Sequence, residues 1–195
     1  PHGETAVELG MPGRHNVGNA LAAAALALGL GVGLEPIARG LAAARPVAGR
    51  LVTHRLDSGA LLVDDSYNAN PGSVAAAIDT LAAGPDEGWL VLGDMRELGE
   101  DERELHADVG RRAKAAGIRR LYTLGALSAA AAEAYGDGAR HFPDHDALAA
   151  ALASDLRAGV RVLVKGSRGS AMDRIVTALL APRRSTAGQE PTHAA

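Results

Sequence analysis

The chain has 195 residues, a formal net charge of -3 and no cysteine. This charge, without any basic stripe of interleaved aromatics, argues against a nucleic-acid binder, and the missing cysteines exclude disulfides and thiolate–metal sites. Hydrophobic residues make up 47% of the chain but aromatics only 3%, so the core must be built from Ala, Leu and Val, which favours helices packed on a sheet.

The chain is expected to begin with one short strand, a break and then a long helix. Residues 5–9 alternate weakly between apolar and polar and suggest one edge strand, and a Gly/Pro-rich break follows at residues 10–13. The helix then runs to about Gly29 with Asn16 as its N-cap. Asn19 therefore shares a face with Asn16 and can present its amide to whatever lies at the start of the helix.

A second helix is expected from Glu35 to about Ala44, and we place a domain boundary where Arg45-Pro46 stops it. The longest apolar run, residues 20–28, is too short for a membrane span, and the start of the chain resembles no signal peptide. A cytoplasmic protein is therefore expected.

Beyond residue 50, strand-like and helix-like runs alternate. Turn residues at 57–59 predict a hairpin, and the continuous apolar run at 89–92 is typical of a fully buried parallel strand. Such alternation predicts an α/β fold with a doubly wound, mostly parallel sheet. We expect strands at 51–56, 60–63, 89–92, 121–124, 140–142 and 160–164, helices at 74–83, 102–116, 127–135, 146–156 and 173–180, and a disordered tail at 183–195.

The most chemically dense segment is residues 64–73, which joins an apolar strand to a helix. The strand ends in two aspartates, and Pro71 biases Asn70 away from helical dihedrals before Gly72-Ser73 opens the helix. In α/β folds such a connection presents side chains and free N–H groups at the carboxyl edge of the sheet, where ligands bind. The alternative is that these residues serve only turn and cap chemistry.

Two further strand ends carry polar clusters, at residues 93–99 and 165–170, and in a doubly wound sheet both face the same edge as the first. The last cluster supplies cations, hydroxyls and backbone N–H groups that suit a carboxylate or a phosphate. It is not a P-loop, because Gly-x-x-x-x-Gly-Lys-Ser/Thr is absent from these 195 residues. The alternative for Lys165 and Arg168 is a solvated turn.

The sequence gives little support for a metal site or for a serine hydrolase. No histidine pair has zinc-ligand spacing with a third ligand in reach, so His106, His141 and His145 are expected to be satisfied or solvated and no metal site is predicted. A Ser-His-Asp hydrolase is excluded because Gly-x-Ser-x-Gly is missing.

Residues 64–73, Asp-Asp-Ser-Tyr-Asn-Ala-Asn-Pro-Gly-Ser, resemble the motif that opens the C-terminal domain of Mur ligases, in the branch that adds D-alanyl-D-alanine. Branches that add single amino acids tend to have lysine where Tyr67 stands. Gly-Asp-Met-x-Glu-Leu-Gly at 93–99 and Lys-Gly-Ser-Arg at 165–168 resemble the same branch, as does His-Asn-x-x-Asn at 15–19. Gly49-Arg50 is similar to the family's domain junction.

The resemblance implies two groups of binding residues and no catalytic residue in this chain. The family's adenine, phosphate and ribose contacts map to a nucleotide group: Asn16, Asn19, Arg50 and Asp65. The strand ends that hold the incoming amino substrate map to a substrate group: Tyr67, Asn68, Asn70, Asp94, Lys165, Ser167 and Arg168.

The resemblance also implies a reaction. ATP phosphorylates the terminal carboxylate of UDP-MurNAc-tripeptide, and the amine of D-Ala-D-Ala attacks the acyl phosphate. The cofactors would be ATP and Mg²⁺, and the protein a monomer. Family members carry the P-loop, the magnesium ligands and the UDP-sugar domain upstream, so this chain is expected to be an inactive C-terminal fragment: residues 1–45 end the central ATP-binding domain and residues 46–182 form the C-terminal domain.

Two alternatives stay open. The first is a stand-alone Rossmann-like module that binds a small ligand and catalyses nothing. The second is another ligase branch, such as a folylpolyglutamate synthase relative, which Tyr67-Asn68-Ala69-Asn70 disfavours.

Overall fold

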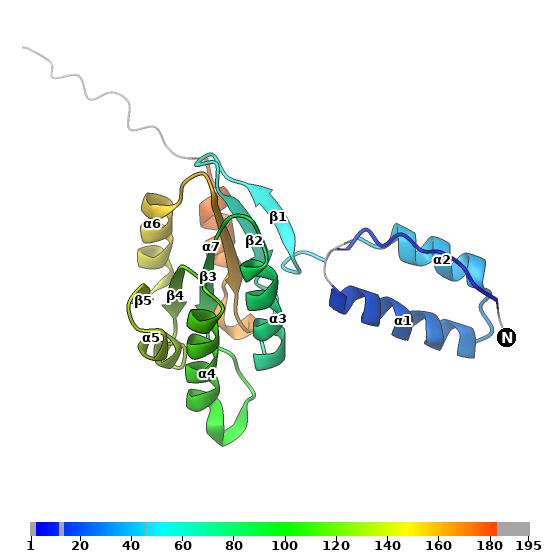
Figure 1. The fold of residues 1–195 in the computed structure, drawn as a ribbon, viewed down its shortest axis with the longest axis horizontal. Helices are drawn as coiled ribbons and strands as arrows, with labels where there is room; N and C mark the ends of the chain where they lie inside the picture. Colours follow the sequence, from blue (N-terminus) through cyan, green and yellow to red (C-terminus); the bar gives the residue numbers. More distant parts are fainter. Residues whose placement is uncertain (1–2, 12–13, 46, 183–195) are drawn as a thin grey trace, which may run out of the picture.

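The structure is a computed structural model that describes residues 3–11, 14–45 and 47–182. A pair of helices comes first and an α/β unit follows (Figure 1). The helices are α1 (Arg14–Gly29), α2 (Leu34–Ala43), α3 (Pro71–Ala82), α4 (Glu102–Ala115), α5 (Ala129–Tyr135), α6 (His145–Asp155) and α7 (Asp173–Leu180). The strands are β1 (Val52–Arg55), β2 (Leu61–Asp65), β3 (Glu87–Gly93), β4 (Arg120–Leu124), β5 (Ala139–Phe142) and β6 (Val160–Lys165).

The six strands form one sheet in the order β1-β2-β6-β3-β4-β5. β1 pairs with β2 as an antiparallel hairpin, and every other neighbouring pair is parallel. The expected doubly wound, mostly parallel sheet is thereby confirmed. Strand β6, the last of the described strands in sequence, lies between β2 and β3, so the carboxyl ends of these three strands are neighbours at one edge.

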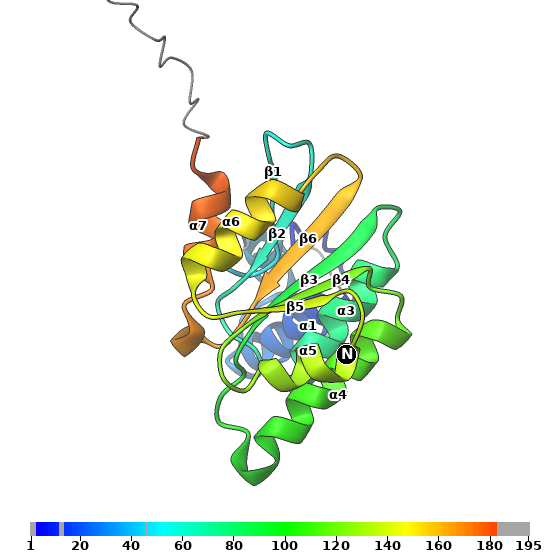
Figure 2. The ribbon, with the colours of Figure 1, turned by 90° about the vertical axis from the view of Figure 1, so that its left-hand side faces the viewer.

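Helices cover both faces of the sheet, as Figure 2 shows. On one face α6 and α7 place Leu148, Leu152 and Ile175 against the sheet, and on the other α3 and α4 place Ile78 and Val109. All five are buried, at 4% exposure or less. Because β3 and β6 are covered on both sides, nearly every residue in them is buried, which explains their continuous apolar sequence.

The expected edge strand at residues 5–9 is wrong: these residues form no regular structure. A strand needs a neighbour that completes its ladder, and the weak alternation over residues 5–9 has none in the described part of the chain. The first helix begins at Arg14, so Asn16 lies inside it and is not the N-cap. The shared face is confirmed, since Asn19 Nδ2 donates to Asn16 Oδ1 at 3.2 Å.

Smaller boundaries also differ. Helix α3 begins at Pro71 with Asn70 as its N-cap, not at Gly72-Ser73, because Pro is well suited to the first helical position. Three expected features lie outside the described residues, in part or in full. The break at residues 10–13 is described only at residues 10 and 11, and neither the boundary residue Pro46 nor the tail at 183–195 is described. Within the described ranges, no helix has both the length and the apolar character that crossing a membrane requires.

Candidate functional site

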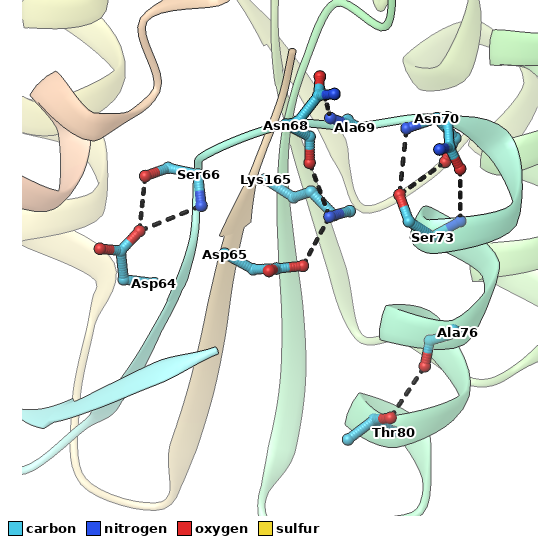
Figure 3. A network of polar contacts seen from close by, with 10 residues as sticks. All are labelled: Asp64, Asp65, Ser66, Asn68, Ala69, Asn70, Ser73, Ala76, Thr80 and Lys165. Carbon is cyan, nitrogen blue, oxygen red and sulfur yellow. Dashed lines mark hydrogen bonds and ion pairs between the residues drawn. The ribbon is translucent and has the colours of Figure 1, made fainter. Parts of the chain in front are cut away.

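An ion pair between a buried lysine and a partly buried aspartate links the ends of β2 and β6. Asp65 and Lys165 stand opposite each other in the parallel register, and Lys165 Nζ donates to Asp65 Oδ2 at 2.6 Å and to the Asn68 carbonyl at 2.8 Å (Figure 3). The side chains of Lys165 and Asp65 are only 4% and 15% exposed. The ammonium group therefore ties the strand end to the loop that follows it, and among the described residues Asp65 Oδ1 has no protein partner.

Local hydrogen bonds shape the rest of this loop. The Ser66 backbone N–H and hydroxyl both donate to Asp64 Oδ1, at 3.1 and 2.6 Å. Asn70 and Ser73 form a capping box at the start of α3: the Ser73 N–H donates to Asn70 Oδ1 at 2.8 Å, and the Asn70 N–H donates to Ser73 Oγ at 3.1 Å. The Asn70 side-chain oxygen thus caps the helix, while its amide nitrogen has no hydrogen-bond partner among the described residues. Asn70 can therefore cap the helix through its side-chain oxygen and still offer its amide nitrogen to a ligand.

Asp94 follows β3 directly and hydrogen-bonds to two other loops at the same edge of the sheet. Its buried carboxylate accepts N–H hydrogen bonds from Leu127 at 3.2 Å and Ser128 at 2.9 Å, just before α5. Its carbonyl accepts from the Ser167 N–H at 2.9 Å and from Ser170 Oγ at 3.3 Å. Asp94 thus joins the loops after β3, β4 and β6, and its Oδ1 is already engaged by protein donors.

Two exposed arginines approach the ring of Tyr67. The guanidinium carbon of Arg50 lies 4.4 Å from the ring centroid and that of Arg168 lies 5.6 Å from it. Tyr67 is itself 39% exposed. A third cation, Arg96, lies beside the loop after β6, because a Cβ on Gly169 would come within 3.0 Å of Arg96 Nε.

The sheet brings the expected residues at 65–70, 94 and 165–168 to one edge, whereas Asn16 and Asn19 lie on α1 in the helix pair. Arg96 was not predicted as a site residue. Its position after β3, two residues beyond Asp94, was the signal that could have identified it. Ser167 is buried, and its hydroxyl lies 3.5 Å from Ser170 Oγ.

The three histidines expected to be satisfied or solvated have protein partners. His106 is fully buried: its Nε2 accepts from the Met95 N–H at 2.9 Å and its Nδ1–H donates to the Glu102 carbonyl at 2.6 Å. His141 Nδ1 lies 2.9 Å from Thr123 Oγ1, and His145 Nε2 lies 2.9 Å from the Ser170 carbonyl. In the described ranges, no group of three or more His, Asp or Glu residues is arranged to hold a metal ion.

A hollow of about 550 Å³ lies away from these residues, between α4 and α5. Its lining includes Glu100, Asp101, Glu104 and Glu133 against a single arginine, Arg103. This acidic lining does not suit an anionic ligand, and none of the residues expected to bind ligand lies in it.

Residues 49–168 match the family described as "Mur ligase, glutamate ligase domain". The chain belongs to the Mur ligase family. It is 47% identical over 181 residues to the UDP-N-acetylmuramoyl-tripeptide--D-alanyl-D-alanine ligase of Escherichia coli (strain K12), a match that covers 92% of this chain and 40% of that protein. The ligase of the same name from Haemophilus influenzae is 37% identical, again over 92% of this chain and 40% of its own length.

Solved structures agree with the Mur ligase assignment. A crystal structure of MurF from Acinetobacter baumannii superposes with a TM-score of 0.82 at 34% identity, over 92% of this chain and 41% of that chain. MurF ligase from Thermotoga maritima, crystallised in complex with ADP, superposes with a TM-score of 0.75 at 26% identity, over 89% of this chain and 40% of that chain. This Mur ligase chain thus spans about 40% of the length of the relatives that it matches.

Proposed function

We propose that this chain is part of an ATP-dependent ligase that joins D-Ala-D-Ala to UDP-MurNAc-tripeptide during the synthesis of peptidoglycan precursors. The observation that carries the proposal is the 47% identity to the E. coli ligase across nearly the whole chain. The D-Ala-D-Ala-type segment at 64–73 adds support, because it lies at the edge of the sheet where strand ends converge. We further propose that residues 1–45 end the central domain and residues 46–182 form the C-terminal domain of a monomeric cytoplasmic enzyme.

On this proposal, four residues contribute to the ATP site. Asp65 accepts hydrogen bonds from the ribose hydroxyls through Oδ1, while Lys165 holds the other carboxylate oxygen in place. Arg50 directs its guanidinium group to the phosphates, which need a cation as charge develops in phosphoryl transfer. Asn19, oriented by its hydrogen bond to Asn16, contacts adenine.

The remaining edge residues are proposed to hold the dipeptide. Arg168 and the N–H groups near Ser167 suit its carboxylate, and the exposed amides of Asn68 and Asn70 suit its polar groups. Asp94 contributes mainly by fixing the loops around the pocket, since Leu127 and Ser128 already occupy one of its oxygens. Lys165 acts through Asp65 and the Asn68 carbonyl, so we propose a positioning role for it in place of direct substrate contact.

In the proposed reaction, a carboxylate oxygen of the tripeptide attacks the γ-phosphorus of ATP and ADP leaves. The dipeptide amine then attacks the acyl carbon, loses a proton, and phosphate leaves. The chain's own residues bind and orient both reactants at this step, which is the main task of a protein in phosphoryl and acyl transfer. Mg²⁺ would offset phosphate charge, but we assign no residue of this chain to it.

A chimera tests the proposal. This chain is joined to the portion of the E. coli ligase that lies outside the matched region, and ADP release is measured with UDP-MurNAc-tripeptide and each amino substrate. We expect ADP release that depends on D-Ala-D-Ala and not on single amino acids, and none from the 195-residue chain alone. A folded chimera that is inactive favours the stand-alone binding module, and one that uses single amino acids or glutamate favours another ligase branch.

A further inference from the structure

The ring of Tyr67 is the meeting point of two arginines that are far apart in the sequence. Arg50 precedes β1, whose first residue pairs with Asp64 at the carboxyl end of β2, and Arg168 follows the carboxyl end of β6. Because β2 lies between β1 and β6, the loop after β2 is flanked by both arginines. Both guanidinium carbons lie within 5.6 Å of the Tyr67 ring centroid.

The backbone fixes one of these arginines relative to Tyr67. The Tyr67 N–H donates to the Gly49 carbonyl at 3.0 Å, and the Arg50 N–H donates to the Val47 carbonyl at 2.9 Å. Gly49 has φ +74°, and a Cβ there would lie 3.0 Å from the Tyr67 nitrogen, so this close approach requires glycine. The turn that carries Arg50 is therefore docked against the residue whose ring Arg50 covers.

Neither Arg50 nor Arg168 has a carboxylate within ion-pair distance among the described residues. Two positive groups near one ring repel each other, and the negative face of the ring offsets only part of that repulsion. An anion that contacts both guanidinium groups would offset the remaining repulsion between them. Their planar arrays of donors suit the several oxygens of a phosphoryl group.

We propose that Arg50, Tyr67 and Arg168 form one two-armed receptor for a phosphoryl-type anion, in which Tyr67 is a positioning residue that holds both guanidinium groups. The receptor joins the arginine proposed to face ATP with the arginine proposed to face the dipeptide, so that a single anion contacts both. The inference rests on the proposed function only for its biological ligand, the phosphoryl group that passes from ATP to the acyl phosphate.

The first test uses the unmodified 195-residue chain, labelled with ¹⁵N and titrated with inorganic pyrophosphate at constant ionic strength. Both the Arg50 and the Arg168 Nε–Hε resonances are expected to move with one shared dissociation constant. Movement of only one resonance, two different constants, or no binding would each overturn the proposal. Arg174→Gln is the matched control, because this arginine is exposed on α7 and has no ion pair among the described residues, and its loss should leave the constant unchanged.

The second test changes the ring. Tyr67→Leu removes both ring contacts and should raise the pyrophosphate dissociation constant about fivefold or more, given typical cation–π energies. Tyr67→Phe keeps the ring face and should stay within about twofold of the parent, which would assign the effect of Tyr67→Leu to the ring and not to the hydroxyl. An unchanged constant in a folded Tyr67→Leu variant would overturn the positioning role; if that variant does not fold, the titration of the parent chain decides.

The two proposals fail separately. If the chain binds pyrophosphate through both arginines while the folded chimera makes no amide bond, the receptor stands and the ligase proposal falls. If the chimera is active but the two resonances titrate independently, the ligase proposal stands and the shared receptor is wrong.

Discussion

Replacing Lys165 by methionine removes the ammonium group and keeps most of the length of the side chain. Asp65 would then hold a carboxylate that is only 15% exposed and has lost its 2.6 Å partner. Removing one member of a buried ion pair typically costs about 3–5 kcal/mol, because the remaining charge is left uncompensated. We expect the lower end, about 3 kcal/mol, since Asp65 keeps some contact with water.

The assay is urea-induced unfolding of the chain, followed by the fluorescence of Trp89, the only tryptophan, which is fully buried in β3 beside β6. The control is Arg103→Met, which breaks an ion pair with Glu133 whose side chains are 66% and 67% exposed and should cost about 1 kcal/mol or less. Adding Asp65→Asn to Lys165→Met should recover about 2 kcal/mol, because the unpaired charge is removed. A loss below about 1 kcal/mol for Lys165→Met, or no recovery in the double variant, would refute the reasoning.

Three further predictions concern the packing of the α/β unit. Burial, and a hydrogen bond to the Asp155 carboxylate on α6, raise the pKa of Tyr122 to about 12. The folded state therefore favours the protonated phenol. The stability that this gives is complete below pH 10 and should be lost as the pH rises towards 12. Unfolding free energies measured from pH 9 to 11 should show this loss reduced in Tyr122→Phe; equal pH slopes would contradict it. His106→Ala leaves the buried Met95 N–H without its acceptor and should lower the free energy of unfolding by at least about 1–3 kcal/mol, whereas a change within about 0.5 kcal/mol would show that water replaces the ring. Gly110→Ala puts a Cβ 2.1 Å from a backbone carbonyl of α5, so its thermal unfolding midpoint should fall by several degrees, and an unchanged midpoint would disprove the tight α4–α5 contact.

The sequence predicted the fold well because hydrophobic periodicity and the order of elements report on burial directly. The run at 89–92 indicated a buried parallel strand, and β3 is one. Failures came where the type of residue is compatible with several conformations: Asn16 suits both a cap and a first helical turn, and the alternation at residues 5–9 carries no information about a partner strand.

The site was harder to predict than the fold. The Lys165–Asp65 pair joins residues 100 positions apart, and only the register of β2 against β6 puts them opposite each other. The engagement of Asp94 with the residues before α5 depends on the path of a loop more than 30 residues later. Periodicity identifies which strand ends share an edge, but it does not show which polar groups are already satisfied by protein partners.

The central position of β6 has a consequence for how the chain acquires its structure. β2 and β3 are not hydrogen-bonded to each other; each pairs with β6, which follows both of them in the sequence and is synthesised after them. Until residue 165 has emerged, the hairpin β1–β2 and the unit β3–β4–β5 each present an unpaired strand edge, the kind of surface that invites wrong association. Insertion of β6 then closes the sheet by contacts of long sequence separation, which is slow, and it delivers Lys165 in the same event. The edge of the sheet at which we propose ligand binding is therefore assembled only when the sheet is complete.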